Sequence, residues 1–86
     1  MNALEIKIRL NECIRNNYAL LDLRRLKLTE LPKLPDNIQI LYCDNNCLSH
    51  LPENLPDSLT IINCGNNKLT NLPNKLPKSL KKLYFN

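Results

Sequence analysis

The sequence predicts an α/β solenoid: a short parallel β-sheet made by a repeated unit, an extended return path, and a helix over the N-terminal end. The equivalent positions Tyr18, Ile38, Leu59 and Leu80 are 20, 21 and 21 residues apart, and a near-fixed period of this length is typical of stacked repeats. The 86 residues include six prolines but only one glycine. Because tight hairpins favour glycine, this composition argues against them and against a sheet of hairpin-connected antiparallel strands.

Each unit fits the leucine-rich-repeat pattern L-x-x-L-x-L-x-x-N-x-L. In the second unit the pattern positions are Ile38, Leu41, Cys43, Asn46 and Leu48. In the third unit they are Leu59, Ile62, Cys64, Asn67 and Leu69. Three units match at one spacing and a fourth begins, so we expect leucine-rich repeats over residues 18–86.

The pattern also predicts the local structure of each unit. Alternation around Leu41 and Cys43 indicates a short strand on the concave face. Asn46 and Asn67 follow at the turn, where their amides suit backbone groups left unpaired by the bend, and stacking would arrange them as a ladder. Two Leu-Pro pairs come next in each unit. Because proline fixes φ near −65°, they favour an extended or polyproline path on the convex side.

The two ends depart from the repeat. Residues 1–17 do not repeat, and Ile6, Leu10, Cys13, Ile14 and Asn17 follow the spacing of one helical face. Alternation over residues 4–10 also fits a strand. We favour a helix, because an open solenoid end needs an amphipathic cover. At the other end, the fourth unit (KLYFN) starts a strand that no capping unit follows. Either the sequence is a piece of a longer protein, or this edge pairs with something; the chain alone should either self-associate, with a closed homodimer favoured, or be marginally stable.

The segments LPENLPDSL and NNKLTNLPNKLPKSLKKL resemble the bacterial leucine-rich-repeat family with an L-P-x-x-L-P spacer, which includes secreted effectors. The likeness covers about residues 18–86. It implies a curved, all-parallel sheet and a non-catalytic recognition role. Some members of that family attach a ubiquitin-ligase domain with a cysteine nucleophile after the repeats, and the 86 residues contain no such domain. For a secreted effector, the place of action would be the host cell cytoplasm.

Charge is concentrated towards the C-terminus, where residues 58–86 carry five lysines and no acidic residue. A basic surface attracts acidic partners or nucleic acid. Only Tyr84 and Phe85 accompany the lysines as stacking groups, so we predict no specific nucleic-acid binding.

The N-terminal segment does not look like a targeting signal. Leu4, Ile6, Ile8 and Leu10 are separated by charged residues, which leaves no apolar run for a signal peptide. No stretch approaches the ~18 apolar residues of a membrane span. We therefore expect no membrane association, a cytoplasmic location and free thiols.

No constellation of residues predicts catalysis or a cofactor. Cys43 and Cys64 occupy equivalent inward positions, where a disulfide is one interpretation and a small apolar core residue is the favoured one. Cys43, Cys47 and His50 also suggest a zinc site, but the two cysteines should lie on different sides of the turn and a fourth ligand is missing. Gly65 is the only glycine, which excludes a glycine-rich phosphate loop. We expect no enzyme activity, no metal and no cofactor.

The outward strand positions form the candidate binding surface. One column across the sheet should contain Leu20, Ile40, Ile61 and Lys82. The next should contain Asp22, Tyr42, Asn63 and Tyr84, with Arg24, Asp44, Gly65 and Asn86 at the strand exits. Three successive aliphatic residues are unusual on a solvated sheet, and tyrosine is enriched at interfaces. The predicted function is binding of a protein partner; the alternatives are a structural or assembly segment, or the substrate-recognition part of a larger protein.

Overall fold

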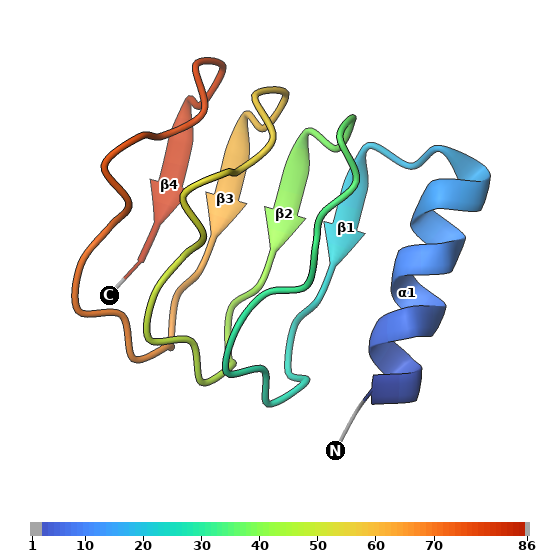
Figure 1. Ribbon diagram of the computed structural model, residues 1–86, viewed down its shortest axis with the longest axis horizontal. Coiled ribbons are helices and arrows are strands. Elements are labelled where there is room, and N and C mark those ends of the chain that lie inside the picture. The colour runs from blue at the N-terminus through green and yellow to red at the C-terminus, as the bar shows by residue number, and fades with distance from the viewer. Residues whose placement is uncertain (1–2, 86) are drawn as a thin grey trace.

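The computed structural model describes residues 3–85 and has one helix followed by four strands (Figure 1). The helix is α1 (Ala3–Asn16), and the strands are β1 (Leu20–Asp22), β2 (Ile40–Tyr42), β3 (Ile61–Asn63) and β4 (Lys82–Tyr84). All neighbouring strands pair in parallel, in the order β1-β2-β3-β4. The predicted leucine-rich-repeat solenoid is confirmed.

Alternate strand residues build the core. The central residues Leu21, Leu41 and Ile62 are at most 1% exposed, while the strand residues on either side of each are half-buried. Two positions further along, Cys43 and Cys64 are fully buried. Residues 23–39, 43–60 and 64–81 return to the next strand without helix or strand structure, as expected for segments rich in Leu-Pro pairs.

The side-chain amide of Asn46 bonds the second repeat to the first. Its Oδ1 accepts hydrogen bonds from Leu26 N and Leu28 N, both at 3.0 Å. Its Nδ2 donates to the carbonyls of Leu23 (2.9 Å) and Cys43 (3.0 Å). Backbone groups that the turn leaves unpaired are therefore satisfied by one buried side chain.

Asn67 makes the equivalent bonds one repeat later. Its Oδ1 accepts from Leu48 N at 2.9 Å, and its Nδ2 donates to the carbonyls of Cys43 and Cys64. Asparagines also precede the ladder residues: Asn45 and Asn66 have φ of 60° and 53°, a left-handed conformation that asparagine tolerates better than most residues.

Helix α1 packs beside β1 at one end of the sheet (Figure 1). Cys13 is buried, and Ile6 and Leu10 pack partly buried against the core. The prediction was wrong for Ile14, which is 62% exposed. The helix covers only the end of a thin solenoid, so its buried stripe is narrow and Ile14 lies outside it.

Asn17 ends the helix and does not join its buried face. It is exposed and has φ of 53°. Its N–H donates to Ile14 O at 3.2 Å, and Tyr18 N–H donates to Cys13 O at 3.0 Å. This pair of bonds is the Schellman arrangement, which turns the chain sharply into the first strand.

The opposite end of the sheet is less closed. Leu80 and Leu83 are only partly buried against the core, and Phe85 is 53% exposed. Within residues 3–85, β4 pairs with β3 on one side and with nothing on the other.

Candidate binding surfaces

The concave face consists of the outward strand residues and the residues at the strand exits. The strand register places Leu20 beside Ile40, Ile40 beside Ile61, and Ile61 beside Lys82. The three aliphatic side chains are half-buried, whereas Lys82 is exposed. They form one apolar row that crosses three strands.

A second row runs parallel to the first. It places Asp22 beside Tyr42, Tyr42 beside Asn63, and Asn63 beside Tyr84. Tyr84 is 51% exposed, and the others are half-buried. This row combines aromatic area with groups that form hydrogen bonds, so the concave face offers both kinds of contact.

The strand exits form a third row. Arg25 N–H donates to Asp44 O at 3.4 Å and Asn45 N–H donates to Gly65 O at 2.9 Å, so the register continues past the strands and aligns Arg24, Asp44 and Gly65. The predicted fourth member, Asn86, lies outside the described residues.

Ion pairs fix the part of the concave face near the helix. The Arg24 guanidinium donates to Asp22 Oδ2 at 2.9 Å and to Oδ1 at 3.1 Å, and it lies 5.0 Å from the centre of the Tyr42 ring. Arg9 Nη1 donates to Asp22 O at 3.0 Å. The hydrogen bonds from Arg24 lower the pKa of the Asp22 carboxyl, which stays ionised at neutral pH. Asp22, Arg24 and Tyr42 therefore contact one another on the surface of the free chain.

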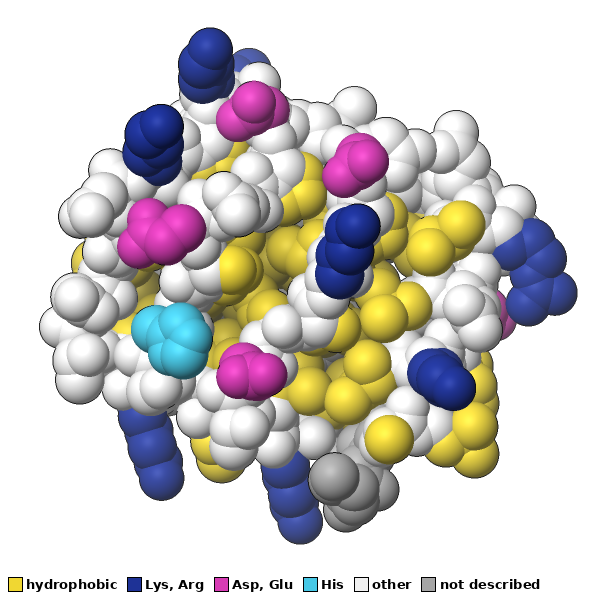
Figure 2. Space-filling model, viewed as in Figure 1, with side chains coloured by type: hydrophobic (Ala, Val, Ile, Leu, Met, Phe, Trp, Pro, Cys, Tyr) yellow, Lys and Arg dark blue, Asp and Glu magenta, His cyan; other side chains and the backbone are white. Residues whose placement is uncertain are grey.

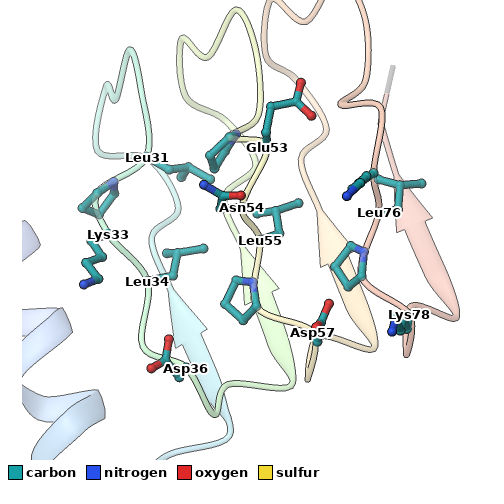
Figure 3. Close-up of a pocket in the computed structure, with 15 residues that line it drawn as sticks. Leu31, Lys33, Leu34, Asp36, Glu53, Asn54, Leu55, Asp57, Leu76 and Lys78 are labelled. Carbon is teal, nitrogen blue, oxygen red and sulfur yellow. The ribbon is translucent and has the colours of Figure 1, made fainter.

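The opposite side of the molecule carries a groove that we did not predict as a surface. We call it the spacer groove; it has a volume of about 920 Å³ and is lined mainly by the leucines and prolines of the return segments. Figure 2 shows hydrophobic side chains in this hollow, with charged side chains around it. In Figure 3, Leu34 and Leu55 extend between neighbouring return segments, and Asp36, Asp57 and Lys78 lie along one rim.

The sequence contained a signal for this groove. The Leu-Pro pairs recur at equivalent positions in all three units, so their side chains had to align on one side. Much of the lining belongs to the core, since Leu34 and Leu55 are each only 8% exposed. Leu76 is the clear exception, with 41% exposure.

The cysteines are free and differ in environment. Cys43 and Cys64 are fully buried, and Cys47 is exposed. Burial raises the pKa of the Cys43 thiol to about 12 and that of Cys64 to about 11, so both are neutral at physiological pH. Across residues 3–85, no three metal-ligating side chains of histidine, cysteine, aspartate or glutamate come together. The same residues contain no helix with the length and hydropathy to span a bilayer.

Comparison with solved structures identifies similar repeats. The chain matches YopM from Yersinia enterocolitica WA-314 with a TM-score of 0.83 and 35% sequence identity, over 90% of this chain and 17% of the YopM chain. It also matches the leucine-rich-repeat domain of a Shigella effector, with 33% identity over 92% of this chain and 54% of that chain, at a TM-score of 0.45. No protein-family model and no curated protein matches.

The match to YopM confirms the predicted resemblance to bacterial effector leucine-rich-repeat proteins. The chain spans less than a fifth of the length of YopM.

Proposed function

We propose that this chain, a leucine-rich-repeat solenoid similar to those of bacterial effectors, is a non-enzymatic module that binds another protein through its concave face. The observation that carries the proposal is the apolar row of Leu20, Ile40 and Ile61, which stays half-exposed beside a row containing Tyr42 and Tyr84. A sheet face that contacts only water normally carries polar residues. A partner that covers this row gains burial of apolar area.

The geometry of the face supports recognition of a preformed surface. Parallel pairing holds the three strands in one register, and Asp22 forms ion pairs with Arg9 and Arg24 at one corner. Little side-chain conformational freedom would be lost on binding, which favours affinity. The site of action in this proposal is the cytoplasm, or the host cytoplasm if the protein is secreted as an effector.

A second function rests on a different observation. The chain spans only 17% of the YopM chain that it matches. A larger protein with the same repeats would use such a segment as a spacer, an assembly element or one part of a substrate-recognition surface. If the segment is a spacer or assembly element, its concave residues would be individually dispensable.

A capture experiment separates these functions. The immobilised 86-residue chain would be compared with a triple variant on the concave face, Leu20→Glu, Ile40→Glu and Tyr42→Ala. The matched control is Leu76→Glu, which places a charge on the exposed part of the spacer groove. We expect the triple variant to lose the specific partner and the control to retain it, with circular dichroism showing both to be folded. Retention of every partner by a folded triple variant would contradict the concave-face proposal.

A further inference from the structure

An open pocket of about 400 Å³ lies at the strand exits of the concave face, beside β3 and β4. Its lining contains a single charged residue, Asp44, together with Asn63, Gly65, Tyr84 and Phe85. A carboxylate and two aromatic side chains in the lining of one pocket suit a cation.

The carboxylate of Asp44 is incompletely satisfied. Its Oδ2 accepts a hydrogen bond from Asn45 Nδ2 at 2.9 Å. Its Oδ1 is buried and has no hydrogen-bond partner among the described residues. A buried carboxylate oxygen without a donor is costly, so a rotation of the Asp44 side chain towards a cationic ligand in the pocket would relieve that cost.

The arginine at the equivalent position one repeat earlier is already engaged. The hydrogen bond and charge of Asp22, and to a smaller extent the charge of Asp44, raise the pKa of the Arg24 guanidinium. Its hydrogen bonds and ion pair nevertheless go to Asp22, and its guanidinium stacks on Tyr42. Within residues 3–85, no salt bridge neutralises Asp44.

Gly65 keeps the space beside Asp44 open. It stands at the position held by Arg24 and Asp44 in the earlier repeats, and it is the only glycine of the chain. Its φ is not positive, so the backbone does not require glycine here. The feature that glycine supplies at this position is room, because any other side chain would project from the same face and occupy the pocket.

Tyr84 and Phe85 form the other wall of the pocket. They are 51% and 53% exposed, which leaves ring surface available to a ligand. A guanidinium stacks on aromatic rings and donates in parallel to a carboxylate, whereas an ammonium is a compact and more strongly hydrated charge. The chemistry of this wall therefore favours arginine over lysine.

The geometry points to a subsite in which the pocket of Asp44, Gly65, Tyr84 and Phe85 receives an arginine side chain of the partner protein. This inference rests on the proposed function, since it names what the partner presents to one end of the concave face. The guanidinium would donate to the Asp44 carboxylate and lie against the aromatic wall, the same combination of contacts that Arg24 makes with Asp22 and Tyr42.

The test uses N-acetyl-arginine amide as a probe, titrated into the isotope-labelled 86-residue chain and followed by amide chemical shifts. We expect saturable shifts centred on residues 44, 65 and 84. The neutral citrulline analogue should produce none, and N-acetyl-lysine amide should bind several-fold more weakly. Equal binding of the lysine and arginine probes would overturn the assignment to arginine, and absence of saturable shifts would overturn the site.

Variants locate the probe. Asp44→Asn should weaken binding about tenfold, the scale of one charge-assisted hydrogen bond, and Gly65→Val should block the pocket. Asp57→Asn, an equal change of charge on the spacer groove, is the control that should leave the titration unchanged. Unaltered binding by a folded Asp44→Asn variant would overturn the inference.

The probe experiment does not depend on partner capture. Failure of the probe together with loss of the partner in the concave triple variant would remove this subsite and leave the proposed function standing. Saturable arginine binding together with full partner retention by the triple variant would leave an arginine-binding pocket in place and remove the proposed concave-face function.

Discussion

The second repeat and the C-terminal end of the solenoid are built from the same motif but are closed to different degrees. Strand β2 lies between β1 and β3, and its Leu41 is fully buried. Among the described residues, strand β4 has one neighbouring strand; its Leu83 is half-buried, and Phe85 is 53% exposed. At the N-terminal end, α1 supplies the neighbour that β1 would otherwise lack.

The comparison shows that burial in this molecule comes from stacking more than from the motif. The ladder asparagines illustrate this: Asn46 is 7% exposed, while Asn67 is half-buried although it makes equivalent bonds. In a solenoid each repeat is stabilised by its neighbours. Equivalent substitutions should therefore have larger effects in the second repeat than near β4.

The largest difference is expected for the central strand leucines. Leu41→Ala should lower the free energy of unfolding by about 3–5 kcal/mol, the usual cost of a cavity in a closed core. Leu83→Ala should cost about 1–2 kcal/mol, because water already reaches part of this site. Urea denaturation measures both changes. Equal losses would contradict the view that closure decreases towards β4.

The ladder asparagines give the next largest difference. Asn46→Ala would leave Leu26 N, Leu28 N and the Leu23 carbonyl without their side-chain partner, at a cost of about 2–4 kcal/mol. Asn67→Ala should cost about 1–2 kcal/mol, since water can replace part of its amide. Thermal unfolding would measure the difference, and a greater loss for Asn67→Ala would reverse the comparison.

Alkaline pH should destabilise the fold through the buried thiols. The folded pKa values of Cys43 and Cys64 are raised to about 12 and about 11, so above pH ~9 the unfolded chain loses these protons first. Stability is fully present below that pH and falls as pH rises, by about 1.4 kcal/mol per pH unit for each thiol. The loss continues to higher pH for Cys43, the more enclosed residue.

The double variant Cys43→Ala, Cys64→Ala provides the control for the thiol prediction. Its stability at neutral pH will be lower, but its decline above pH ~9 should be shallower than in the wild type. Parallel declines from pH 9 to 11, followed by chemical denaturation, would show that other groups cause the alkaline loss.

The smallest expected effect is self-association through β4. Because α1 covers the other end, head-to-tail stacking is blocked and a two-fold pairing of β4 edges is the remaining closed arrangement. Lys81 and Lys82 oppose it weakly, so salt should promote it. Sedimentation over a range of concentrations measures the effect. A monomer at all concentrations, with protected amides at residues 80–85, would mean that the edge needs no partner.

Repeat spacing predicted the fold well, because the period of 20–21 residues fixes which side chains stack. The strand register and the identity of each outward column followed from that period alone. The end of the buried stripe on the helix did not follow from the repeat period, because it depends on how α1 tilts across one narrow end of the solenoid. Ile14 was misplaced for that reason.

The volumes of the two hollows lay beyond sequence reasoning, although the aligned Leu-Pro pairs signalled the spacer groove. The spacer groove depends on the depth between return segments. The pocket at Asp44 depends on Gly65 lying beside it in the next repeat, although the sequence had already marked Gly65 as the only glycine of the chain. Alignment of repeats identifies such neighbours, but it does not give the volume left between them.

The central claim, that a partner protein binds the concave face, is tested most directly by mapping the amide chemical shifts that change when the captured partner is added to the labelled chain. We predict changes concentrated at residues 20–24, 40–44 and 61–65, with little change at residues 31–36, 52–57 and 75–78 around the spacer groove. Changes confined to the spacer groove would contradict the claim.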